Sequence, residues 1–181
     1  MRRNRPPRRP FRRPGPRGVP PELRHANELL ENGEYAEAAV AFEKIAKQAD
    51  RRRGPRAPHF HLRAGQAYIL CDEADKGMAH IRQGLGAIAA RKHWEPFQRL
   101  GQRVVDELNG LGHTKEADEI LAYITAKLPD GRFTPSQARE FRPTHPTHCS
   151  GCGAPVRADE VEWIDLQTAE CIYCGNPIRG E

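Results

Sequence analysis

The sequence predicts a mainly α-helical protein with three antiparallel helix pairs, a small C-terminal β module and a disordered N-terminal tail. Three observations lead to this prediction. Apolar residues recur at helical spacing from Pro21 to about Leu128, in segments that come in pairs. Two cysteine pairs enclose short alternating segments near the C-terminus. The first 18 residues carry eight arginines and five prolines but no acidic residue.

We therefore expect four segments in the 181 residues: a tail over 1–18, a helical domain over 19–128, a joint over 129–147 and a cysteine-containing domain over 148–181. Within the joint, Thr134-Pro135-Ser136-Gln137 is a capping box with proline at the first helical position. It predicts a short capping helix at about 135–141, followed by a proline-rich extended linker.

Charge is distributed unevenly along the chain. Of the 29 Lys and Arg, eight lie in residues 1–18, while all 24 Asp and Glu lie beyond them. Repulsion between like charges and the lack of apolar surface predict a disordered tail. The tail has no apolar segment typical of a secretory signal, and the chain has no run of ~18 apolar residues that could span a membrane. We expect a cytoplasmic protein that does not bind membranes.

The first helix pair is divided at Asn32-Gly33, which supplies a helix end and a tight turn. In the helix that follows, Ala38, Phe42 and Ile45 recur three to four residues apart and predict one apolar face. The string Gly33-Glu34-Tyr35-x-x-Ala38-x-x-x-Phe42 resembles the tetratricopeptide repeat, with Ala26 and Leu29 in the small and large places of the preceding helix. The resemblance implies a solenoid in which small residues let paired helices approach closely.

The same template fits the chain twice more. The small residues of the three second helices are Ala38, Gly77 and Ala117, spaced by 39 and 40 residues against about 34 in this repeat family. The second unit lacks the turn glycine, and the third has Val105 where a small residue is expected. An irregular helical bundle is the alternative interpretation.

Four cysteines form the strongest local motif. Cys149 and Cys152 belong to one CxxCG element, and Cys171 and Cys174 belong to another. Two such loops supply four thiolates, a closed tetrahedral set that suits one structural Zn²⁺. Strands are expected at 155–157 and 160–164. The arrangement resembles the zinc ribbon family, which implies a small sheet held by two cysteine loops.

Alternative interpretations of these cysteines have less support. Iron fits the same four thiolates, a redox dithiol needs only one CxxC, and disulfides are disfavoured in a reducing compartment. His145 and His148 could replace a ligand, but four cysteines already complete the shell. We expect the proline-rich joint to link the metal domain loosely to the helices and to transmit little strain. Changing one cysteine to serine should therefore unfold the metal domain but leave the helices of residues 21–128 nearly intact.

No enzyme signature is present: there is no phosphate-binding loop, dinucleotide fingerprint, nucleophile elbow or HExxH. His59 and His61 are expected to be solvated at a helix start. The chain is therefore predicted to be a non-catalytic scaffold that binds a protein or acidic peptide in a groove formed by the first helix of each pair. The resemblance places these residues in the groove: Arg24, Asn27, Arg63, Gln66 and Arg103.

Arginine with Asn or Gln in these places suits a carboxylate, through charge-assisted bonds. Asp106, at the corresponding place in the third unit, departs from that chemistry. The alternative function is association with nucleic acid or the ribosome. Because residues 149–181 hold two arginines and six acids, that binding is expected only through the tail, without sequence preference.

Overall fold

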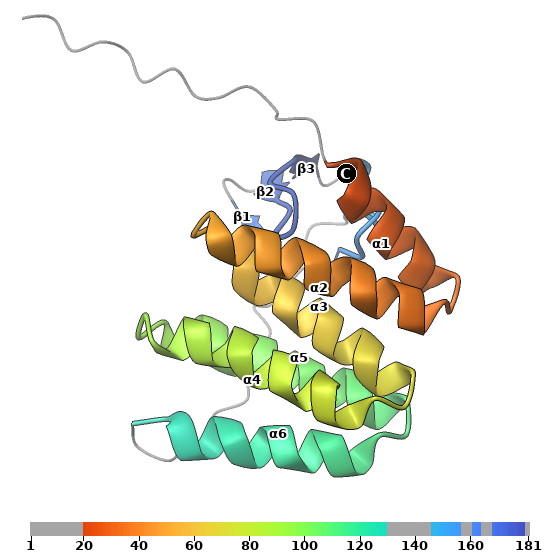
Figure 1. Cartoon of the computed structure of the whole chain (residues 1–181). Coiled ribbons are helices and arrows are strands. Elements are labelled where there is room, and N and C mark those ends of the chain that lie inside the picture. The colour runs from red at the N-terminus through yellow and green to blue at the C-terminus, as the bar shows by residue number, and fades with distance from the viewer. Residues whose placement is uncertain (1–19, 130–145, 157–160, 164–167, 180–181) are drawn as a thin grey trace, which may run out of the picture.

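The structure is a computed structural model that describes residues 20–129, 146–156, 161–163 and 168–179. Within these ranges six helices follow one another in antiparallel succession, and three short strands form a sheet at one end of the helix stack (Figure 1). The helices are α1 (Pro21–Glu31), α2 (Tyr35–Arg51), α3 (Ala57–Leu70), α4 (Ala74–Ala89), α5 (Trp94–Gly110) and α6 (Thr114–Lys127). The prediction of three helix pairs between Pro21 and Leu128 is confirmed.

The turn inside each pair has the same backbone structure. After α1, Gly33 adopts a φ of +79°, and the N–H of Glu34 donates to the carbonyl oxygen of Leu29 at 2.9 Å. Gly112 repeats this conformation after α5. After α3 the place is taken by Asp72, with a φ of 64°, and Asp is among the few non-glycine residues that tolerate the left-handed region. The missing glycine of the second unit therefore does not prevent the turn.

Small residues let the helices of a pair approach closely, as the repeat pattern predicts. A methyl group placed on Gly77 would lie 2.5 Å from Cγ1 of Ile69 and 2.7 Å from the carbonyl oxygen of Gly65. Gly65 has the reciprocal relation to Gly77 and Ile81. The backbones of α3 and α4 are thus in near contact, and no larger residue fits between them.

The three strands lie in chain order in one antiparallel sheet: β1 (Glu162–Trp163), β2 (Thr168–Glu170) and β3 (Pro177–Arg179). Of the strand expected at 160–164, the structure shows Glu162–Trp163 as β1, and residues 160 and 164 lie outside the described residues. The strand expected at 155–157 is reduced to a single bridge between Pro155 and His148, while β2 and β3 were not predicted. The name cysteine module is used below for the described residues from 146 to 179.

Two apolar clusters fill the interior. One is formed by α3 to α6 around side chains such as Leu85, Phe97 and Ile124. The other joins α1, α2 and α3 to the cysteine module and includes Phe42, the cysteines and Tyr173. The expectation that the metal domain is only loosely joined to the helices is therefore wrong, because both parts bury their apolar surface in one shared core.

Two predicted segments lie outside the described residues: the tail over 1–18 and the capping helix at about 135–141. In the part of the chain that is described, no helix is both long enough and apolar enough to cross a membrane.

We predict that Gly77→Ala lowers the free energy of unfolding by about 1–3 kcal/mol, because the new methyl group meets backbone and Ile69 atoms that cannot move away cheaply. Gly110→Ala is the matched control, since nothing lies within 4 Å of a methyl group there and alanine favours the helix by up to about 1 kcal/mol. Urea unfolding of both variants measures the difference, and equal stabilities would contradict the close approach.

Candidate metal centre and first-helix face

The four predicted ligands meet at one point. The sulfur atoms of Cys149, Cys152, Cys171 and Cys174 all lie within 4.8 Å of one another. Two of the separations are 3.7 Å (Cys149 to Cys174) and 3.8 Å (Cys152 to Cys171). A tetrahedral ion with metal–sulfur bonds of about 2.3 Å requires edges of about 3.8 Å, whereas a disulfide needs about 2.05 Å. The geometry suits one tetrahedral metal ion, and all the cysteines are free of disulfides.

The two cysteine loops have matching backbones. Gly153 and Gly175 adopt φ values of +75° and +78°, and each donates its N–H to the carbonyl oxygen of the first cysteine of its loop, at 2.9 and 2.8 Å. In the second loop the N–H of Asn176 also points at the sulfur of Cys174, at 3.5 Å. Loops of this kind direct N–H groups toward thiolates, which explains why a glycine follows each pair.

Electrostatics favours a bound cation. Hydrogen bonds donated by the thiols of Cys152 and Cys174 lower the pKa of Cys171, and the bond between Cys152 and Cys171 raises the pKa of Cys152. One thiolate therefore forms easily, but each further thiolate in this buried cluster repels the first. A divalent cation removes that repulsion, so these residues fit a metal that binds with release of protons.

The cysteine module is anchored on the face formed by α1, α3 and α5, here called the first-helix face. Asn27 is almost fully buried and donates its amide to the carbonyl oxygens of Cys152, at 2.9 Å, and of Leu23, at 3.0 Å. Arg63 donates from Nε to the hydroxyl of Tyr173 at 3.0 Å, and its guanidinium lies 5.1 Å from the centre of that ring. Asn27 and Arg63, two of the predicted partner-binding residues, therefore bind the cysteine module of the chain itself.

Two ion pairs tie the edges of the module to the helices. Arg56 pairs with Glu170 of β2, and His148 lies 3.2 Å from a carboxylate oxygen of Glu31. His148 thus lies beside the first cysteine loop but is directed to α1. This contact agrees with the expectation that it is not needed as a metal ligand.

The other predicted partner-binding residues have different surroundings. Arg24 is exposed on α1. Gln66 and Arg103 are buried, and both contact the carboxylate of Glu107, with Arg103 Nε at 2.9 Å. The three arginines are thus not equivalent, and their role in binding a partner stays a prediction.

Three further side chains lie on this face but were not predicted there: His59, Arg99 and Tyr173. The ring of His59 meets Tyr173 edge to face at 6.3 Å. Burial first, and then the charges of Arg56, Arg103 and Arg99, lower the pKa of His59 to about 4. The signal was present in the spacing, because His59 and Arg99 lie four residues before Arg63 and Arg103 and so share their helix faces.

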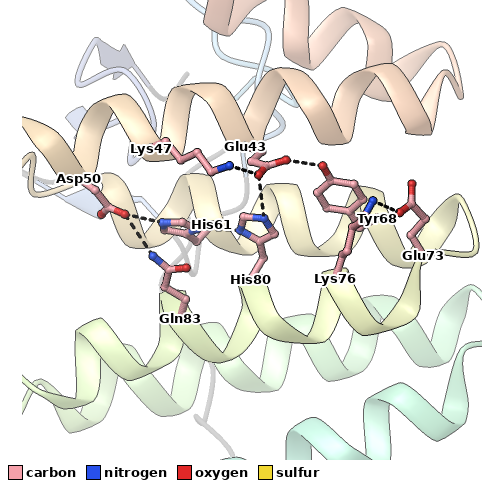
Figure 2. A network of polar contacts seen from close by, with 9 residues as sticks. All are labelled: Glu43, Lys47, Asp50, His61, Tyr68, Glu73, Lys76, His80 and Gln83. Carbon is pink, nitrogen blue, oxygen red and sulfur yellow. Dashed lines mark hydrogen bonds and ion pairs between the residues drawn. The ribbon is translucent and has the colours of Figure 1, made fainter.

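His61 belongs to a polar network between α2, α3 and α4 (Figure 2). Its Nε2 lies 2.9 Å from Asp50, and its Nδ1 lies 2.9 Å from Nδ1 of His80. His80 stacks between His61 and Tyr68, and Tyr68 donates to Glu43. The expectation that His59 and His61 are solvated is wrong: His59 is half-buried against Tyr173 of the cysteine module, and His61 is buried in a network that joins three helices.

The comparisons with known proteins found no match: neither a family model, nor a curated protein, nor a solved structure resembles the chain significantly. The argument about function therefore depends on the residues and geometry described above.

We predict one zinc ion per chain, measured by metal analysis of the purified protein. Cys152→Ser should lose the ion and also lower the melting temperature of the helices by roughly 5 °C or more, because the module shares the core of α1 to α3. Cys71→Ser is the matched control, since Cys71 lies outside the cluster. Helices that melt unchanged in Cys152→Ser would restore the original expectation of two independent parts.

We also predict that His59 makes stability depend on pH. Its pKa is about 4 in the folded chain and about 6.5 when unfolded, so the unfolded chain binds more protons between these values. The free energy of unfolding should therefore fall as the pH drops from 6.5 to 4, by roughly 2–3 kcal/mol. Urea unfolding at pH 7 and 4.5 should show a smaller loss for His59→Gln than for the exposed control His25→Gln.

Proposed function

We propose that the protein is a non-catalytic adaptor, with a tetratricopeptide-like helical solenoid and a zinc ribbon, that binds a partner protein through its first-helix face. The main support for this proposal is a buried guanidinium group with an unused hydrogen-bond donor. Nη2 of Arg63 is buried, and among the described residues it has no hydrogen-bond partner. Because a buried unsatisfied donor is costly, its presence favours an acceptor supplied from outside.

The surroundings of Arg63 indicate the chemistry of that acceptor. Arg56, Arg99 and Arg103 all lie close enough to lower the pKa of His59 beside it. Nε of Arg99 is also buried with no hydrogen-bond partner among the described residues. Several guanidinium groups around one place suit a carboxylate, which accepts two parallel N–H bonds from an arginine. The proposed ligand is an acidic peptide or a C-terminal carboxylate.

The cysteine module decides where such a peptide would bind. It already uses Asn27 and the Nε of Arg63, at the end of the first-helix face near α1. We therefore propose that the partner binds the part of the face contributed by α3 and α5, next to Tyr173, with the zinc ribbon forming one wall of the site. In this arrangement the metal is structural, because four cysteine ligands leave no open position for chemistry.

We predict that Arg99→Ala and Arg103→Ala each weaken the binding of a labelled Glu-rich peptide with a free carboxylate by about tenfold, since a bond to a charged group contributes about 1.5–3 kcal/mol. Arg63→Lys should also weaken it, because an ammonium cannot make the planar two-pronged contact. Fluorescence anisotropy with the full chain is the measurement.

The control for this experiment is Arg82→Ala. Arg82 is an exposed arginine on α4 that lies 3.4 Å from Glu119, and α4 does not contribute to the first-helix face. Its loss removes the same charge and should change peptide affinity by less than about twofold. Equal weakening by Arg82→Ala would mean that only net charge matters, and the assignment to the first-helix face would be wrong.

A further inference from the structure

One edge of the helix stack is basic. Because the helices alternate in direction, the ends of α2, α4 and α6 lie along the same edge, at the left of the view in Figure 1. Each of these ends carries Lys or Arg. The residues, here called the basic edge, are Arg51 at the end of α2, Arg52 and Arg53 after it, Arg91 and Lys92 after α4, and Lys127 at the end of α6.

All six side chains of the basic edge belong to exposed residues. Within the described part of the chain, no ion pair joins any of them to a carboxylate, unlike Arg82, Arg99 and Arg103. Lys127 only lies over the ring of Tyr123, at 5.8 Å. Their charge is therefore available to a ligand.

Two of these residues are held in an unfavourable backbone conformation. Arg53 and Lys92 have φ values of 50° and 57°, in the left-handed region that costs a residue with a side chain about 1–2 kcal/mol. At the opposite edge, two of the three turns place glycine in this conformation, at Gly33 and Gly112. Basic side chains at strained positions serve the stability of the fold poorly, which points to a function for them.

The opposite edge carries the opposite charge. Exposed carboxylates gather at the turns between α1 and α2 and between α3 and α4: Glu31, Glu34, Glu37, Asp72, Glu73 and Asp75. Basic residues therefore predominate at one edge, where Asp50 and Glu95 are also exposed, and acidic residues predominate at the other, where Lys76 and Lys115 are also exposed. Such a field orients a polyanion toward one edge and repels it from the other.

Residues 1–18, which precede the helices in the sequence, contain eight arginines and no acid. Trp94 follows two residues after Lys92, only half-buried, and is the type of side chain on which a nucleic-acid base stacks.

We propose that the basic edge binds single-stranded nucleic acid through its phosphate backbone, independently of sequence. A row of separate basic turns suits a flexible polymer of regular negative charge, and arginine contacts phosphate in two-pronged fashion. The proposal goes beyond the adaptor function and uses a different face, so either can fail alone. It also differs from the expectation that binding resides in the tail only.

The test uses the full chain with its eight tail arginines changed to Gln, so that only the folded part contributes. The probe is a labelled 20-nucleotide oligouridine, followed by anisotropy across a salt series. We expect R52Q/R91Q/K92Q to weaken binding about tenfold near 0.1 M salt, and to reduce the slope of log Kd against log salt by about 2, for three lost phosphate contacts. K44Q/R82Q/K115Q, which removes the same charge away from the basic edge, should change affinity less than about twofold.

Arg53→Gly separates function from folding. Glycine relieves the left-handed backbone, so this variant should melt at a higher temperature while binding oligouridine several-fold more weakly. A residue with only a structural role would not show stability and binding moving in opposite directions.

Three outcomes would overturn the proposal. The first is no oligouridine binding at micromolar protein once the tail is neutral. The second is an equal loss of affinity in the two triple variants. The third is competition by polyglutamate, or by anionic lipid vesicles, that matches competition by unlabelled oligouridine at equal charge concentration, which would assign the basic edge to an acidic protein or a membrane surface.

Discussion

The arrangement of the C-terminal part of the chain depends on one constraint: four cysteine sulfurs converge in a buried place where their charges repel one another. A β-sheet whose strands have only two or three residues cannot bury enough apolar surface to fold alone. A cation that neutralises the sulfurs supplies what the small core lacks. The turns at Gly153 and Gly175 meet the same constraint, because their matching backbones place the four sulfurs at tetrahedral separations.

The same module completes the helical part. α1 and α2 expose an apolar side to α3 and to the cysteine module, and the shared core includes the cysteines themselves. Asn27 illustrates how closely the two parts are joined: it lies on α1, is buried, and satisfies a backbone carbonyl of the first cysteine loop. The surface on which we propose that a peptide binds is therefore built from both parts.

Charge is organised on a larger scale than any single contact. Arginines gather on the first-helix face and along the basic edge, while carboxylates occupy the opposite turns. On the first-helix face Arg63 and Arg103 are buried and hydrogen-bonded. The Lys and Arg residues of the basic edge are exposed, and none of them pairs with a carboxylate among the described residues. Because buried guanidinium groups impose geometry and exposed ones mainly contribute field, the two surfaces suit different ligands: a single carboxylate in one case and a flexible polyanion in the other.

The helix pairs and the candidate metal-binding cysteines could be predicted from the sequence alone, because both rest on local spacing. Periodic apolar residues place the helices from α1 to α6, and two CxxCG loops identify the four cysteines. Only the tertiary structure decided that the cysteine module docks on α1 and α3, that His61 is buried in a polar network, and that the basic turns share one edge. These features depend on contacts between residues as far apart as Arg63 and Tyr173, and local periodicity does not encode such pairing.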